Sequence, residues 1–245
     1  MEESGAEYLV ALRHNPRGNT GALSATIQTV MAVSRTLDVL EGDPFDPPPD
    51  SGGMFGSRLF AFTDKLDTTN RLYWDLLSAE GWAWPGKPET GANPLTLAHL
   101  RSRDQGRLPT PRREDALQRD PEGQYWWLAE ALGHGVDADI QKRIGRTSSQ
   151  DSGVASDADV VVATASLEVG FDDDRVGAVL QHKAPHDAAQ FLQRKGRAGR
   201  NAATRPWTIV VLSDWGRDRD AWDAYDALFS PVVPPRSLPL DNLYV

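Results

Sequence analysis

The chain has 245 residues, of which 40% are hydrophobic and 25% are charged, and its formal net charge is -9 at pH 7. This length and composition provide for one hydrophobic core with an appended subdomain, and they exclude a chain that is disordered throughout. The absence of cysteine excludes disulfides and thiolate zinc sites, and the acidic balance argues against nonspecific coating of nucleic acid, because that affinity depends on cations.

The N-terminal region, residues 1–40, is expected to contain a polar lead-in and one packing helix. Its first residues lack the positive start and apolar core of a secretory signal, so we expect a cytoplasmic protein without membrane association. Residues 1–20 are polar and mixed, with turn signals at 15–20. Apolar residues then recur at helical spacing over residues 24–40, with Ser24 as the candidate N-cap.

Residues 41–57 are rich in proline and glycine and are expected to form a linker or loop. A strand is expected over residues 58–63 and a helix over residues 67–79. Strand, turn and helix in this order are the unit that opens a parallel sheet. Either Asp64 or Asp67 could cap the helix.

Residues 82–122 combine Trp82 and Trp84 with prolines and several arginines. Basic residues interleaved with aromatic ones can bind single-stranded nucleic acid. Acidic residues dilute the charge here, however, and the tryptophans could instead fix the segment to the core, which is the interpretation we favour. A short helical pattern follows at residues 123–133.

Strands are expected over residues 140–147, 159–164 and 176–181. The second of these is a continuous apolar run, as is typical of a strand buried on both faces of a parallel sheet. Between the second and third strands lies Ala-Ser-Leu-Glu-Val-Gly-Phe-Asp, residues 165–172. His182 and His186 follow the third strand, but Pro185 breaks a helix between them, so we expect a loop with solvated imidazoles and no metal site.

Residues 193–200 read Gln-Arg-Lys-Gly-Arg-Ala-Gly-Arg, after a helix expected over residues 187–192. Arg197 and Arg200 are each preceded by glycine. An arginine fork matches phosphate oxygens in pairs, and glycine lets the backbone approach a ligand, so this stretch suits a polyphosphate. The alternative is a basic turn on the surface. A strand at 207–212 and a helix at 221–229 follow, and residues 231–245 form an extension that we expect to be truncated.

Three of these segments resemble the motifs of superfamily 2 (DEAD/DEAH-type) helicases. Residues 164–172 resemble motif V, residues 193–200 resemble motif VI, and the unit at 58–79 resembles motif IV. The resemblance implies that the chain forms the second, C-terminal one of the two RecA-like lobes of such a helicase. This lobe would have an α/β, three-layer fold with a mostly parallel sheet and helices on both faces. It would occupy residues 58–230, with residues 82–122 as an insertion. The sequences of residues 167–172 and 181–185 are similar to the corresponding stretches of large bacterial helicases, including those of phage-defence and DNA-modification islands.

The resemblance also implies roles for individual residues. Arg197 and Arg200 would be arginine fingers that act on ATP, with Gly170, Asp172 and Gln193 at the nucleotide side. The residues near the nucleic-acid backbone would be Thr63, Lys65, Thr164 and Ser166. Glu168 stands where many relatives carry a different residue, so its role stays open. The crossover before residue 159 is short, so family contacts do not transfer to Thr147, Ser149 or Gln150.

Two features of the first helicase lobe are missing from the sequence: a Gly-x-x-x-x-Gly-Lys-Ser/Thr phosphate loop and a strand ending in a magnesium-binding Asp-Glu pair. The triplet Ser24-Ala-Thr26 matches motif III, but that motif belongs to the first lobe, and we treat the match as coincidence. We therefore expect part of an ATP-dependent helicase or translocase that acts on DNA or RNA. It would be inactive until a first lobe, in the same protein or in trans, supplies most of the binding of ATP and Mg²⁺. The alternative is a non-catalytic RecA-like module for nucleic-acid binding or assembly.

Overall fold

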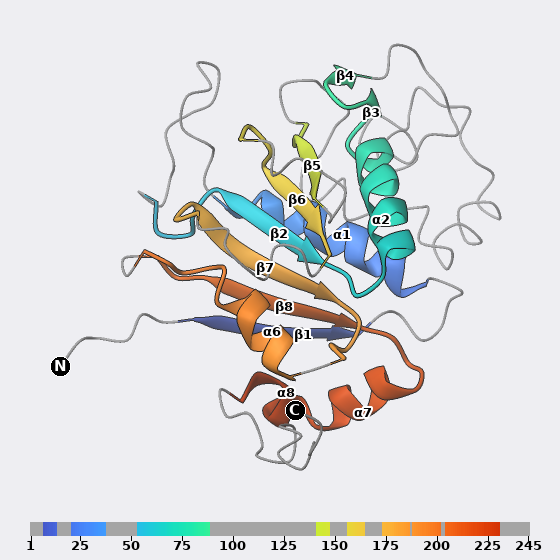
Figure 1. Cartoon of the computed structure of the whole chain (residues 1–245), viewed down its shortest axis with the longest axis vertical. Helices are drawn as coiled ribbons and strands as arrows, with labels where there is room; N and C mark the ends of the chain where they lie inside the picture. Colours follow the sequence, from blue (N-terminus) through green and yellow to red (C-terminus); the bar gives the residue numbers. More distant parts are fainter. Residues whose placement is uncertain are drawn as a thin grey trace, which may run out of the picture.

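A sheet of six parallel strands forms the centre of the computed structural model (Figure 1). The structure describes residues 7–13, 21–37, 53–88, 141–147, 156–164, 173–186, 188–201 and 204–230. Across the sheet the strands are β1 (Tyr8–Arg13), β8 (Trp207–Leu212), β7 (Val176–His182), β2 (Arg58–Phe62), β6 (Val160–Ala163) and β5 (Ile144–Thr147). The five strands that the sequence predicted are all present, and β2 lies between β7 and β6.

Helices cover both faces of the sheet. On one face are α1 (Ala22–Ser34) and α2 (Leu66–Ala79), and on the other are α6 (Ala188–Lys195), α7 (Arg217–Asp223) and α8 (Tyr225–Phe229). Because side chains alternate along a strand, Leu59 and Ala61 of β2 pack toward α1 and α2, whereas Phe60 and Phe62 belong to the opposite core cluster. The predicted α/β, RecA-like three-layer fold is confirmed.

β1 is an edge strand that the sequence analysis did not predict. It pairs in parallel with β8, and the ring of Tyr8 stacks on that of Trp207 with centroids 4.4 Å apart. The run Tyr-Leu-Val-Ala-Leu is apolar but short, and both Leu9 and Leu12 stay partly exposed at 42% and 36%. The lead-in expected over residues 1–20 therefore contains a strand at Tyr8–Arg13.

The helices begin at other residues than expected. α1 starts at Ala22 with Gly21 as its N-cap, and no side chain caps it, so Ser24 is not the cap. The N-cap of α2 is Lys65, also without a side-chain bond, while Asp67 lies in the first turn, where a carboxylate favours the helix dipole. The helix expected over residues 221–229 is divided into α7 and α8 at Ala224.

Only the start of the expected insertion lies among the described residues. It forms a small antiparallel hairpin of β3 (Trp82–Trp84) and β4 (Lys87–Pro88). The indole of Trp82 donates to the carbonyl oxygen of Lys142 at 2.8 Å and packs against the core, so this tryptophan fixes the hairpin to the domain. Residues 89–140, with the basic run and the short helix expected at 123–133, lie outside the described residues.

A buried ion network ties together the amino ends of the strands. The side chain of Arg58 is 1% exposed and donates to the Asp173 carboxylate and to the carbonyl oxygens of Ala158 and Ser156. Burial lowers the pKa of Arg58 despite its partner. Burial alone would raise the pKa of Asp173, but hydrogen bonds from Arg175 and the two positive charges lower it below its usual value. The start of β2 is thus attached to the segments that precede β6 and β7.

No helix within the described parts of the chain is long and apolar enough to cross a membrane.

Candidate functional site

α6 carries the residues that resemble motif VI to the amino edge of the sheet. The helix starts shortly after the carboxyl end of β7 and runs back along the sheet (Figure 1). Beyond its end, the backbone N–H of Gly199 donates to the carbonyl oxygen of Val176, the first residue of β7, at 3.3 Å. Arg197 and Arg200 therefore lie at the edge where the strands begin.

The turn after α6 explains one of the two glycines. Gly199 has φ +73°, and a Cβ atom there would lie 2.6 Å from Cγ of Pro206, so only glycine fits without a shift. Arg200 is exposed and its Nε donates to the carbonyl oxygen of Gly196 at 3.1 Å, while Arg197 is half-buried and Gln193 is exposed. The turn presents cationic forks and an amide at one end of the helix, which suits an anionic ligand.

The N-terminal segment supports this turn from behind. Glu7 forms an ion pair with Nζ of Lys195 at 2.9 Å and accepts a hydrogen bond from the Thr208 hydroxyl at 2.9 Å. A cavity of about 250 Å³ adjoins it, lined by Glu7, Lys195, Gly196, Ala198, Gly199, Asn201, Thr204 and Pro206. The two contacts of Glu7, with Lys195 and with Thr208, limit the movement of the end of α6.

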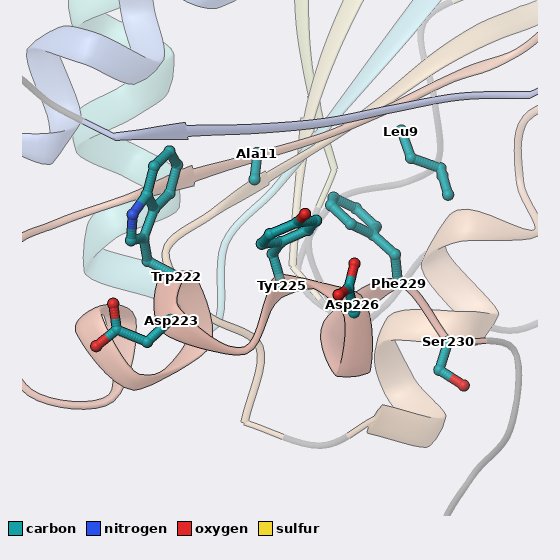
Figure 2. A pocket seen from close by; sticks show the side chains of 8 residues that line it. All are labelled: Leu9, Ala11, Trp222, Asp223, Tyr225, Asp226, Phe229 and Ser230. Atoms are coloured by element: carbon teal, nitrogen blue, oxygen red, sulfur yellow. The ribbon is translucent and has the colours of Figure 1, made fainter.

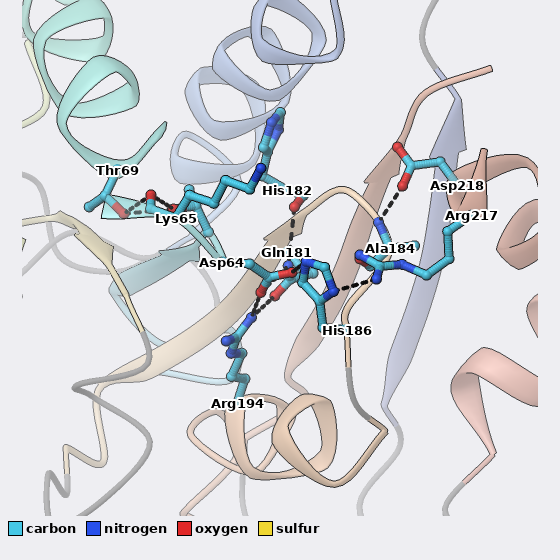
Figure 3. Close-up of polar contacts among 11 residues, drawn as sticks. Asp64, Lys65, Thr69, Gln181, His182, Ala184, His186, Arg194, Arg217 and Asp218 are labelled. Carbon is cyan, nitrogen blue, oxygen red and sulfur yellow. Dashed lines mark hydrogen bonds and ion pairs between the residues drawn. The ribbon is translucent and has the colours of Figure 1, made fainter. Parts of the chain in front are cut away.

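Arg194 is a buried arginine on the inner side of α6, and the sequence analysis did not single it out. It is 1% exposed, and its Nη1 donates to Asp64 at 2.5 Å and to Gln181 at 2.7 Å (Figure 3). Its guanidinium lies 5.5 Å from the ring centroid of Phe62. Asp64 is the second residue after β2, so this arginine joins the motif VI helix to the end of the motif IV strand. The sequence signal that could have identified Arg194 as buried is its spacing: it lies three residues after Phe191, the other buried residue of α6, and therefore on the same face of the helix.

A chain of polar contacts continues from Asp64 to the first turn of α7. His186 Nε2 lies 3.7 Å from the Asp64 carboxylate, and Arg217 contacts the other ring nitrogen of His186. Arg217 also donates to the carbonyl oxygen of Ala184 at 2.7 Å. Asp218 accepts from the backbone N–H of Ala184 at 2.9 Å (Figure 3). The carboxyl ends of β2, β7 and β8 are connected by these contacts.

The two histidines do not converge on one site. His182 is the last residue of β7, is 6% exposed, and shares a 2.7 Å hydrogen bond with the hydroxyl of Thr26 in α1. Burial, followed by the nearby charge of Lys183, lowers the pKa of His182 to about 4. The expectation of two solvated imidazoles is therefore wrong for His182. The contact also gives Thr26 a packing role.

Three of the residues predicted to contact nucleic acid lie at the carboxyl edge of the sheet. β2 and β6 are parallel neighbours with Phe62 opposite Ala163, so the residues that follow these two strands meet at that edge. Lys65 is exposed and Thr164 is half-buried. Thr63 is fully buried, and its hydroxyl bonds to the Thr69 hydroxyl at 2.6 Å and to the Lys65 carbonyl oxygen at 3.1 Å. Thr63 thus braces the turn that leads into α2.

The predicted nucleotide residues and nucleic-acid residues are not brought together. Gln193, Arg197 and Arg200 extend toward the amino edge, while Thr63, Lys65 and Thr164 lie at the carboxyl edge. Ser166, Gly170 and Asp172 fall outside the described residues, as do Ser149, Gln150 and Glu168. The described residues on either side of the motif V segment are Thr164 at the carboxyl edge and Asp173 before the amino end of β7.

A larger cavity, of about 840 Å³, lies away from all of these residues. It is lined by Leu9, Ala11, Trp222, Asp223, Tyr225, Asp226, Phe229 and Ser230. Figure 2 shows Trp222, Tyr225 and Phe229 turned toward Leu9 and Ala11 of the edge strand β1. The sequence did not predict this cavity, because β1 itself was not predicted.

Comparison with known proteins identifies a helicase segment. Residues 134–202 match the family model of the helicase conserved C-terminal domain, a range that includes the motif V and motif VI segments. The resemblance to helicase C-terminal lobes is confirmed over this part of the chain. No curated protein matches the chain.

Solved structures with a similar arrangement include three helicases. S. cerevisiae Dbp5 bound to RNA and ADP BeF3 has 15% identity and a TM-score of 0.43, with 94% of this chain and 40% of that chain covered. The DUF1998 helicase MrfA bound to DNA has 13% identity and a TM-score of 0.45, with 93% and 22% covered. Mycobacterium smegmatis Lhr bound to ssDNA and AMP-PNP has 16% identity and a TM-score of 0.41, with 85% and 20% covered. The chain spans less than half the length of each.

Proposed function

We propose that this chain, which carries a helicase conserved C-terminal domain over residues 134–202, is the second RecA-like lobe of an ATP-dependent nucleic-acid helicase or translocase. The observation that carries the proposal is the turn after α6. Its two arginines are anchored from the inside by the buried pair of Arg194 and Asp64, and from behind by the pair of Lys195 and Glu7. A turn held at two points can keep guanidinium groups in place at a cleft, as electrostatic stabilisation of a phosphoryl transfer requires.

In this proposal Arg197 and Arg200 act as arginine fingers, with Gln193 beside them. ATP with Mg²⁺ would supply the phosphoryl group that is transferred to water. The donor set at the turn fits phosphate oxygens. Within the described residues, however, no cluster of three His, Asp or Glu side chains could hold a metal ion. A first lobe with a phosphate loop would therefore bind most of the nucleotide and the metal, with Gly170 and Asp172 of this chain toward it.

Nucleic acid, either DNA or RNA, would lie along the carboxyl edge in this proposal. Lys65 is exposed there at the start of α2, and Thr164 follows the neighbouring strand. Ser166 would extend the same path, and Thr63 would contribute through the backbone, because its hydroxyl is bonded within the turn. The motif V segment, which starts at Thr164 on this edge and ends before Asp173, would link nucleic acid to nucleotide.

The alternative function is a RecA-like module that binds nucleic acid or assembles with partners without catalysis. The missing phosphate loop favours it. The two functions differ in whether a first lobe exists, in the same protein or encoded by a neighbouring gene. Only the helicase lobe needs Arg197 and Arg200 for turnover.

The test restores the first lobe, covalently or in trans, and measures ATP hydrolysis against nucleic-acid concentration. Activity stimulated by nucleic acid is expected, and Arg200→Ala should lower kcat by about 10³-fold or more. Arg197→Lys should be nearly as damaging as Arg197→Ala, because lysine keeps the charge but loses the fork. Arg71→Ala, on the exposed side of α2, is the control and should leave kcat unchanged. If Arg197→Lys and Arg200→Ala both kept the full kcat, the turn would be only a basic surface. That result would favour the binding module.

A further inference from the structure

The loop after β8, residues 213–216, presents an exposed tryptophan at the carboxyl edge of the sheet. Trp215 is 79% exposed, more than any other large hydrophobic residue in the described part of the chain; Trp84 follows at 61%. An indole buries a large area when it is covered, so leaving it in water forgoes a large stabilisation. Its place at the edge that Lys65 and Thr164 share points to a binding role.

Hydrogen bonds to a buried carboxylate close this loop at its base. Asp218 is 5% exposed, and its carboxylate accepts from the backbone N–H of Ser213 at 2.9 Å, from the Ser213 hydroxyl at 2.5 Å and from the N–H of Ala184 at 2.9 Å. Gly216 has φ +55° and ψ -138°, which residues with a side chain rarely adopt. These bonds hold the backbone on both sides of Trp215 before any ligand arrives, which lowers the conformational entropy that binding costs.

The residues that flank Trp215 in the chain and in the neighbouring strand end are charged. Arg217 and Arg219 follow it by two and four residues, and Lys183 follows β7, the strand beside β8; all three are exposed. Asp214 is in an ion pair with Arg13, and Asp220 is the exposed carboxylate of the first turn of α7. A hot spot for a protein partner lies in an apolar surround that excludes water. A nucleic-acid base instead needs one aromatic face with cations nearby for the phosphates.

The loop is also continuous with the predicted nucleic-acid residues. Arg217 contacts His186, and His186 lies 3.7 Å from Asp64, the residue before Lys65 (Figure 3). A strand of nucleic acid at the end of β2 can therefore pass over the ends of β7 and β8 to reach Trp215.

We propose that Trp215 stacks on a base of single-stranded nucleic acid at the carboxyl edge, with Lys183 and Lys65 at the flanking phosphates. The proposal rests on the proposed function, because it assumes that nucleic acid occupies this edge. It adds a base-contacting residue in the loop after β8, where none of the three helicase-like motifs lies. Stacking on an aromatic face tolerates any base sequence, as expected of a translocating lobe.

The experiment measures Kd of the purified chain for fluorescein-labelled single-stranded dT12 and U12 by anisotropy, at several salt concentrations. Trp215→Ala should weaken binding roughly 5- to 150-fold, the range of one lost stack, without changing the salt slope. Trp215→Phe should keep most of the affinity. Lys65→Ala should reduce the slope by about 0.7, the contribution of one phosphate on a single strand. Trp84→Ala, exposed on the hairpin at the far end of α2, is the matched control and should bind as the unaltered chain does.

Two results would overturn the proposal in different ways. If Trp215→Ala binds as tightly as the unaltered chain while Lys65→Ala binds more weakly, the stacking role is wrong and the nucleic-acid edge stands. If the unaltered chain binds neither oligonucleotide, both the stacking role and the proposed function are wrong. Trp215 is exposed, so its substitution should not affect folding, which circular dichroism checks.

Discussion

The guanidinium of Arg194 connects the helix that carries Arg197 and Arg200 to the residue that follows β2. It is a buried charge with a nearly buried partner, and removing one member of such a pair leaves the other uncompensated. We expect Arg194→Gln to lower the free energy of unfolding by roughly 3 kcal/mol, measured by urea denaturation. Gln193→Ala, at the exposed neighbouring position of α6, should change it by less than about 0.5 kcal/mol.

A double-mutant cycle separates this ion pair from general packing. Arg194→Gln combined with Asp64→Asn should cost less than the sum of the single changes, because the second change removes the charge that the first one stranded. Additive losses would show that Arg194 and Asp64 contribute independently, and that α6 is anchored by other contacts.

His182 makes the stability of the molecule dependent on pH. Burial and the charge of Lys183 lower its pKa to about 4 from the usual value of 6.5. Between these two values the unfolded chain binds more protons than the folded one, so stability is complete above pH 6.5 and falls as the pH drops toward 4. Over this window the unaltered chain should lose roughly 3 kcal/mol more than His182→Gln does. A stability difference that stays constant from pH 7 to pH 4 would contradict the prediction.

At the scale of elements, the amino ends of three strands depend on one side chain. Arg58 at the start of β2 reaches the segments before β6 and before β7, and it pairs with Asp173, which follows the motif V segment. Arg58→Ala would leave the Asp173 carboxylate buried with Arg175 as its remaining cationic partner among the described residues. We expect a loss of about 3 kcal/mol in the free energy of unfolding. Arg71→Ala breaks an exposed pair on α2 and should cost less than about 0.5 kcal/mol. Equal losses for the two variants would mean that the network around Arg58 adds nothing to stability.

At the scale of the whole molecule, the sheet separates the two ligand sides that we propose. The arginine turn lies at the edge where the strands begin, and Lys65, Thr164 and Trp215 lie where the strands end. In the proposed function, a change at one of these edges would reach the other through the motif V segment and the buried contacts around Asp64. A first lobe would complete the cleft that the arginines face.

The chain by itself should therefore hydrolyse no ATP above background, with or without nucleic acid, because its sequence contains neither a phosphate loop nor the magnesium-binding carboxylate pair. Phosphate release in the presence of Mg²⁺ is the measurement. If this chain alone showed robust Mg²⁺-dependent hydrolysis, and Arg200→Ala abolished it, the chain would not be half of an ATPase site as we propose.

The sequence by itself determined the interior strands and the arginine turn. A continuous apolar run such as that of β6 can only be buried on both faces, and the glycines and arginines of residues 196–200 are a local pattern. The tertiary structure decided the rest. β1 is an edge strand whose backbone partners lie about two hundred residues away in β8, and a short, half-exposed run does not reveal its partner. Arg194 turns inward only because α6 packs over β2 and β7, where Asp64, 130 residues earlier in the chain, offsets its charge. Local periodicity shows which residues are apolar, but contacts between distant segments decide which charge is buried.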